Sequence, residues 1–323
     1  DSSGRVSDII ATNVQANNGV IHAINKVILP LQQPTTNNIV DVAVGSENLS
    51  TLVAALERAD LVTTLANQGP FTVLAPSNEA FNTFLCDNGF SNLDDVPVDV
   101  LNNILRNHVI GGRLESTDLT TGYASTFATT PASDANMSIF IDISNGVKFN
   151  GISSVTDADI SADNGIVHVV DAVIGLPSVV TFAVADPTFS TLVAALTRDD
   201  LTTDFVGVLS TATGTSPAPF TVFAPTNDAF GSLLSELGIA GLADIDEPTL
   251  DAVLKNHVVA GANVLDTDLT DDMTVSTLGG DITANVTGGA TLTDSSGRVS
   301  DIIATNIQAN NGVIHAINKV ILP

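Results

Sequence analysis

The spacing of hydrophobic and polar residues switches between helical and strand-like periods along the chain. Residues 50–56 read STLVAAL, with apolar side chains at helical spacing, and the same letters return at 190–196. Serine often caps a helix N-terminus, so both stretches predict amphipathic helices that begin at a serine cap. The run FTVFA (220–224), stopped by Pro225, predicts a strand.

Two further stretches in the second half predict helices. TNDAFGSLL (226–234) has Thr226 or Asn227 in position to cap a helix. PTLDAVLKNHVVAG (248–261) carries proline in its first turn and predicts a helix ending near Gly261.

Strand signals follow the helical ones. SIFIDI (138–143) and DITANVT (281–287) are rich in β-branched residues, and Asn-Gly pairs at 145–146 and 150–151 are typical of hairpin turns. GVIHAINKVIL (312–322) predicts a closing strand. Helices that come first and strands that come later indicate an α+β fold.

Four blocks occur twice in the same order, which indicates two homologous domains at 38–177 and 178–323. The paired blocks are 49–61 with 189–201, 70–81 with 219–230, 101–112 with 250–261, and 163–177 with 310–323. Residues 31–37 are predicted to be a polar linker. Residues 1–30 repeat 294–323 with Val14 in place of Ile307, which predicts the C-terminal segment of a preceding copy.

The charge balance limits the classes of partner. The chain has 36 acidic and 10 basic residues, a formal net charge of −26. Neutralising the phosphates of nucleic acid needs clustered lysine and arginine, so nucleic acid is excluded as a partner. The sequence has no run of about 18 apolar residues, and we expect no membrane insertion in this segment.

The sequence contains no Gly-x-Ser-x-Gly, Walker or GxGxxG motif. The single cysteine, Cys86, excludes an intramolecular disulfide and is expected to be a small buried residue at a helix end. We expect no cofactor and no metal site, since the acidic runs at 157–163, 244–248 and 266–272 do not fit a calcium loop. His22, His168 and His315 are expected to be half-buried strand residues.

The four repeated blocks resemble the fasciclin-like domain of cell-adhesion and extracellular-matrix proteins. FTVFAPTNDAF (220–230) and NGVIHAINKVILP (311–323) correspond to its two signature segments. The resemblance implies two tandem domains, each a β-sheet wedge or sandwich with helices packed around it. It also implies a secreted or cell-surface location, a non-catalytic adhesive or scaffolding role, and partners among cell-surface or matrix components.

The resemblance also carries over candidate adhesion residues. A Tyr-His pair of the family falls here on Asn107-His108 and Asn256-His257, so the histidine is kept and the tyrosine is replaced. The alternative is that each histidine ring bonds a carbonyl or caps the helix end.

An Asp-Ile adhesion element of the family falls on Asp159-Ile160. In the second domain we expect it at Asp301-Ile302, followed by an apparent insertion at 307–311. The alternative is an isoleucine that points into the core beside a turn aspartate.

The favoured hypothesis is a structural or adhesive protein built as a tandem array or fibre, whose partners include other copies or neighbouring repeats. A soluble module that binds a glycan or small ligand near His108 or His257 is the alternative, and a hydrolase has little support. For residues 1–30, we favour a window cut from a longer array of period 293 over donation of a strand to another molecule.

Overall fold

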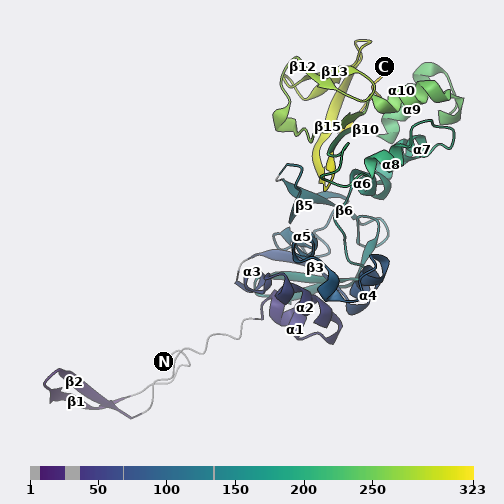
Figure 1. Ribbon diagram of the computed structural model, residues 1–323. Coiled ribbons are helices and arrows are strands. Elements are labelled where there is room, and N and C mark those ends of the chain that lie inside the picture. Colours follow the sequence, from purple (N-terminus) through teal and green to yellow (C-terminus); the bar gives the residue numbers. More distant parts are fainter. Residues whose placement is uncertain (1–7, 26–36, 68, 134) are drawn as a thin grey trace.

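The computed structural model describes residues 8–25, 37–67, 69–133 and 135–323. The predicted linker at 31–37 lies outside the described residues except for Asn37. Residues 37–177 (the first half) and 178–323 (the second half) each begin with helices and continue into strands, as Figure 1 shows. The predicted α+β class is confirmed.

The first half contains five α-helices and seven strands among its described residues. The helices are α1 (Ile39–Val44), α2 (Ser50–Arg58), α3 (Val62–Asn67), α4 (Asn78–Asp87) and α5 (Val98–Asn107), with 3-10 turns η1 (Glu47–Leu49) and η2 (Leu93–Asp95). The strands are β3 (Phe71–Pro76), β4 (Val109–Gly111), β5 (Gly122–Thr129), β6 (Asn136–Asp142), β7 (Lys148–Phe149), β8 (Ser153–Ala162) and β9 (Gly165–Val170).

The second half repeats this order. Its helices are α6 (Val179–Ala185), α7 (Ser190–Leu196), α8 (Phe205–Leu209), α9 (Asn227–Leu237) and α10 (Glu247–Lys255), with η3 (Pro187–Phe189), η4 (Leu242–Asp244) and η5 (Asp266–Asp268). Its strands are β10 (Phe220–Pro225), β11 (Val258–Ala260), β12 (Met273–Ser276), β13 (Asp281–Asn285), β14 (Thr291–Thr293), β15 (Val299–Ala309) and β16 (Gly312–Ile317).

The sheets share one strand order. In the second half it is β11-β10-β16-β15-β14-β13-β12, and in the first half a pair between Ile110 and Thr126 closes the corresponding strands into a barrel. Among the named strands of the described residues, β3 pairs with β9 and β10 pairs with β16 in parallel. These four strands are buried along their whole length, which explains why FTVFA is apolar without alternation.

A glycine is required where the closing strand begins. A Cβ atom at Gly165 would lie 2.1 Å from the carbonyl oxygen of Phe71, and one at Gly312 would lie 2.2 Å from that of Phe220. The repeated Asn-Gly of the closing segment therefore lets two parallel strands approach each other closely.

The starts of the helices differ in part from the prediction. Ser50 and Ser190 do not cap α2 and α7. Instead, side chains from α4 and α9 accept the first free amides: Asn78 Oδ1 lies 2.9 Å from the Thr51 nitrogen, and Asn227 Oδ1 lies 2.8 Å from that of Thr191. The sequence pattern does not indicate these caps, because each is supplied by an asparagine of another helix. The predicted cap of α9 is confirmed at Thr226.

Two other local predictions are wrong. The helix predicted to end near Gly261 ends at Lys255, because Val258–Ala260 pair with β10 as strand β11. Cys86 lies in the last turn of α4 as expected, but it is exposed. The core-facing side of α4 is formed by Ala80 and Phe81, and Cys86 lies on the opposite side of the helix.

A separate hairpin precedes the first half. Strands β1 (Ile9–Ala16) and β2 (Gly19–Ile24) pair in the same register as β15 and β16, residue for residue at an offset of 293. Its apolar side chains are exposed, whereas those of β16 are buried. In the described residues, its hydrogen bonds all lie within 8–25.

The two halves contact each other directly. The Tyr123 ring lies 5.0 Å from that of Phe140 and 5.5 Å from that of Phe182, and its hydroxyl donates to Asp186 Oδ2 at 3.0 Å. The backbone amide of Gln308 donates to Ser138 Oγ at 3.0 Å. Phe140 therefore packs into the core of the second half.

In the described residues, no single helix is long and apolar enough to cross a membrane. The joined segments Val179–Ala185 and Pro187–Leu196 reach that length and composition together, with a bend of 94° between them.

Candidate functional site

His108 and His257 follow helices α5 and α10, and the two rings make the same pair of hydrogen bonds. The Nδ1 of His108 lies 2.8 Å from the Ile104 carbonyl, and its Nε2 accepts the Ile174 amide at 2.9 Å. His257 bonds the Val253 carbonyl at 2.8 Å and the Ile321 amide at 2.9 Å. A carbonyl needs a donor and an amide needs an acceptor, so both rings are the neutral tautomer with hydrogen on Nδ1.

Burial dominates the electrostatics of these rings. Desolvation lowers the pKa of both His108 and His257 to about 4, against a smaller raising effect of the backbone hydrogen bond. Each ring is 2 % exposed and joins a helix end to the segment that follows the closing strand. The geometry matches the alternative in which the ring bonds a carbonyl.

The neighbouring asparagines are buried as well. Asn107 donates from Nδ2 to the Gly175 carbonyl at 3.0 Å and accepts the Thr126 hydroxyl at 3.2 Å. Asn256 accepts the Thr277 hydroxyl at 3.4 Å and packs so closely on Gly279 that a Cβ there would lie 2.2 Å from its Oδ1. The Asn-His pairs therefore contact other parts of their own half.

Asp159 lies at a bulge in β8 and reaches the surface. Its backbone is left-handed, with φ of 62°, and its amide donates to Nδ1 of His168 at 3.2 Å. Hydrogen bonds from the hydroxyl and amide of Ser116 hold the pKa of the Asp159 carboxyl below its usual range. Ile160 packs against the core of the first half.

The expected counterpart at Asp301-Ile302 is wrong by five residues. Ile307 pairs with Ile314 across the hairpin in the same way that Ile160 pairs with Val167. The structural match of Asp159-Ile160 is therefore Asn306-Ile307. The two hairpins have equal length, and the apparent insertion at 307–311 does not exist. Counting back from the Asn-Gly turn would have given this register.

Asn306 repeats the conformation of Asp159. Its φ is 56°, its amide lies 3.4 Å from Nδ1 of His315, and its side chain bonds Asp266. Asp301 instead accepts from Nδ2 of Asn318 at 2.7 Å, and Ile302 packs partly buried against the sheet core. The sequence pattern did not indicate the hydrogen bonds between Asn306 and Asp266.

The strand histidines are more buried than expected. His168 and His315 have no exposed surface, and the Nε2 of each lies 2.9 Å from a backbone carbonyl, of Leu114 and Val264 respectively. His22 in the leading hairpin is exposed. Within the described ranges, no group of three or more His, Cys, Asp or Glu side chains is arranged to hold a metal ion.

Comparison with known proteins assigns the family. The family profile described as Fasciclin domain matches residues 47–177 and 187–323. The chain belongs to the fasciclin domain family. Fasciclin domains are typically adhesion or extracellular-matrix-binding modules.

Relatives of different lengths share these domains. Protein sll1483 of Synechocystis sp. is 40% identical over 137 residues, which cover 42% of this chain and 72% of that protein. Human periostin is 29% identical over 271 residues, which cover 80% of this chain but 29% of periostin. A solved domain pair from the insect cell adhesion molecule fasciclin I is 19% identical, covers 84% of this chain and 92% of that one, and gives a TM-score of 0.47.

Proposed function

We propose that this protein is a non-catalytic, extracellular adhesive or structural protein of the cell surface, built from tandem fasciclin domains that act as an array. The observation that carries the proposal is the family match in two tandem copies. Relatives such as periostin and fasciclin-1 contain domains of the same family. The partners would be cell-surface or matrix components and further copies of these domains.

The geometry supports contacts through surfaces rather than through an enclosed site. The Asn-His pairs are buried in both halves, so we propose that they position helix ends and do not touch a partner. Asp159 is exposed and stays a candidate contact residue. A glycan-binding cleft at His108 or His257 would first require the buried ring to become accessible.

The leading hairpin supports assembly with further fasciclin domains. Ile9, Val14, Val20, Ile21 and Ile24 are 57%, 49%, 47%, 59% and 38% exposed. Their counterparts in 302–317 are buried or half-buried against the rest of the second half, in the same register. We infer that residues 8–25 complete a further fasciclin-like unit through the contacts that β15 and β16 make here.

Imaging the native protein on the cells that make it would test this function. We expect surface-attached, repeating or fibrous material. Isolated, unattached pairs of domains would contradict the proposal.

A pair of variants tests the role of the hairpin. Ile21→Asp should abolish ordered assembly seen by electron microscopy, because the counterpart Ile314 is 1 % exposed. Thr12→Asp is the matched control, since its counterpart Thr305 is exposed. Equal assembly of both variants would contradict the inference.

A further inference from the structure

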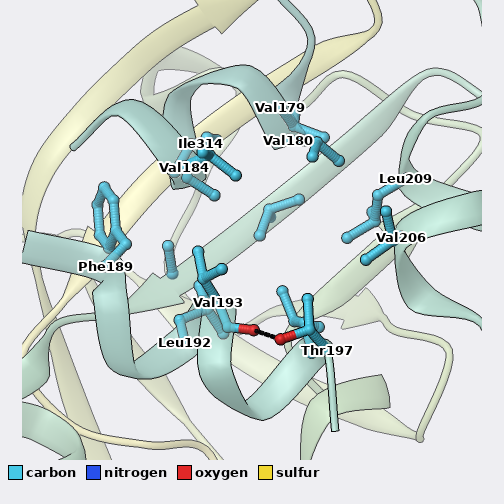
Figure 2. A pocket seen from close by; sticks show the side chains of 14 residues that line it. Val179, Val180, Val184, Phe189, Leu192, Val193, Thr197, Val206, Leu209 and Ile314 are labelled. Carbon is cyan, nitrogen blue, oxygen red and sulfur yellow. Dashed lines mark hydrogen bonds between the residues drawn. The ribbon is translucent and has the colours of Figure 1, made fainter. Parts of the chain in front are cut away.

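The second half contains an apolar pocket between α6, α7, α8 and the sheet. Its volume is about 100 Å³, and Leu209, Val222 and Ile314 are buried residues of its lining. In Figure 2, Val179, Val180 and Val184 lie opposite Leu192 and Val193 across this space. Val184 and Val206 line the pocket while remaining 67% and 38% exposed, so the pocket opens to solvent at a rim of valines.

The lining offers no partner for a polar ligand. All the lining side chains are hydrocarbon except that of Thr197, whose hydroxyl donates to the Val193 carbonyl at 2.8 Å (Figure 2). A sugar or an ion placed inside would lose its hydrogen bonds to water without replacement. A neutral hydrocarbon group would gain by leaving water.

Differences between the two halves explain why the space is open. Asn164 donates to the Leu65 carbonyl at 2.6 Å, and Asn311 donates to that of Leu209 at 2.8 Å, so α3 and α8 correspond at these leucines. Leu65 follows Leu61 by four residues, whereas Leu209 follows Leu201 by eight. The connection that leads to this leucine is therefore four residues longer in the second half.

A shorter side chain adds to this difference. Ile39 and Val179 are the first residues of α1 and α6. The Ile39 Cδ1 atom reaches to within 2.8 Å of where a Gly165 Cβ would lie. Val179 lacks that terminal methyl group and lines the pocket instead.

We propose that this pocket binds a small neutral hydrocarbon group, such as the end of an unbranched alkyl chain. The volume is of the same order as an apolar cavity of about 150 Å³ that takes up one benzene molecule or xenon. This site does not include Asp159, and its lining comes from the second half alone. The second half would thereby carry a ligand site of its own within the domain pair.

The test is a methyl NMR titration of the full chain with 1-hexanol, with glucose as the polar control. Saturable shifts are expected for the methyl groups of Val193, Val222 and Ile314 with hexanol and not with glucose. The proposal would be overturned if hexanol produced no saturable shift up to its solubility limit. It would also be overturned if the shifts were spread equally over both halves.

Three variants show where the probe binds. Val179→Ile fills part of the pocket with one methylene and should weaken hexanol binding about fourfold. Val184→Arg places a charge at the rim and should weaken it about tenfold or more. Val44→Arg is the matched control, because Val44 is the counterpart of Val184 in α1 and is 65% exposed. An equal effect of the two arginine variants would overturn the proposed site.

Discussion

At the scale of single residues, four buried histidines form hydrogen bonds inside the protein. His108 and His257 use both ring nitrogens on backbone groups, and so do His168 and His315 of the closing hairpins. A buried polar group without a partner would cost about 1–3 kcal/mol, so each ring stabilises two backbone groups that the fold would otherwise leave unpaired. In this chain the family's histidine therefore has a structural contact in each half, made by hydrogen bonds to backbone groups.

Burial of these rings predicts a loss of stability in mild acid. The folded pKa of His108 and His257 is about 4, below the ordinary value of 6.5. As pH falls below about 6.5 the unfolded chain takes up protons that the folded chain refuses, so the free energy of unfolding decreases until about pH 4. Each ring should remove about 3 kcal/mol across this window.

Urea denaturation from pH 7.5 to 4.5 measures this loss, and histidine ring NMR identifies its source. The carboxyls with lowered pKa, such as those of Asp159 and Asp271, act mostly below this window because their ordinary value is 3.8. A His257 ring that becomes charged near pH 6.5 in the folded protein would contradict the explanation.

At the scale of elements, one bulged hairpin occurs three times in the chain. Asn13, Asp159 and Asn306 have φ of 57°, 62° and 56°, and each donates its amide to the Nδ1 of a histidine nine residues later. Aspartate and asparagine tolerate the left-handed region better than other residues with a side chain. The left-handed backbone at the bulge therefore accounts for the residue type at these positions.

Two substitutions at Asn306 separate the backbone effect from the side-chain effect. Asn306→Ala and Asn306→Gly both lose the bonds to Asp266, but only alanine is strained at φ of 56°. The alanine variant should be less stable than the glycine variant by about 1 kcal/mol. Thermal or urea unfolding gives the difference, and equal stability would show that the bulge relaxes.

At the scale of the whole molecule, the contact between the halves forms a domain pair. Tyr123 packs on Phe182 and donates to Asp186, both in the helical part of the second half, and β15 bonds to β6 through Gln308 and Ser138. Burial and the nearby Asp186 carboxylate raise the pKa of Tyr123, so its hydroxyl stays protonated as the donor. These contacts fix how the two domains of the pair face each other.

Removing the tyrosine ring should uncouple the halves. In the native protein we expect one rotational correlation time for both halves, and in Tyr123→Ala two different ones. ¹⁵N relaxation measures both. Phe127→Ala is the control in the same strand, since the Phe127 ring packs on Phe71 of the first half. Unchanged tumbling of the Tyr123 variant would show that the polar contacts are sufficient.

The sequence by itself determined the family, the α+β class and the strands that close each half. Those features follow from local periodicity, turn chemistry and internal repetition, which depend on neighbouring residues along the chain. It also narrowed the cap of α9 to Thr226 or Asn227, and the family resemblance placed both Asn-His pairs near helix ends.

Only the tertiary structure decided which residues reach the surface and which meet across the sheet. The caps from Asn78 and Asn227, the end of α10 at Lys255 and the match of Asp159 with Asn306 all depend on contacts between segments far apart in sequence. The apolar pocket and the contact at Tyr123 arise in the same way. The free energy that stabilises these contacts comes from packing in three dimensions, which the order of residues alone does not display.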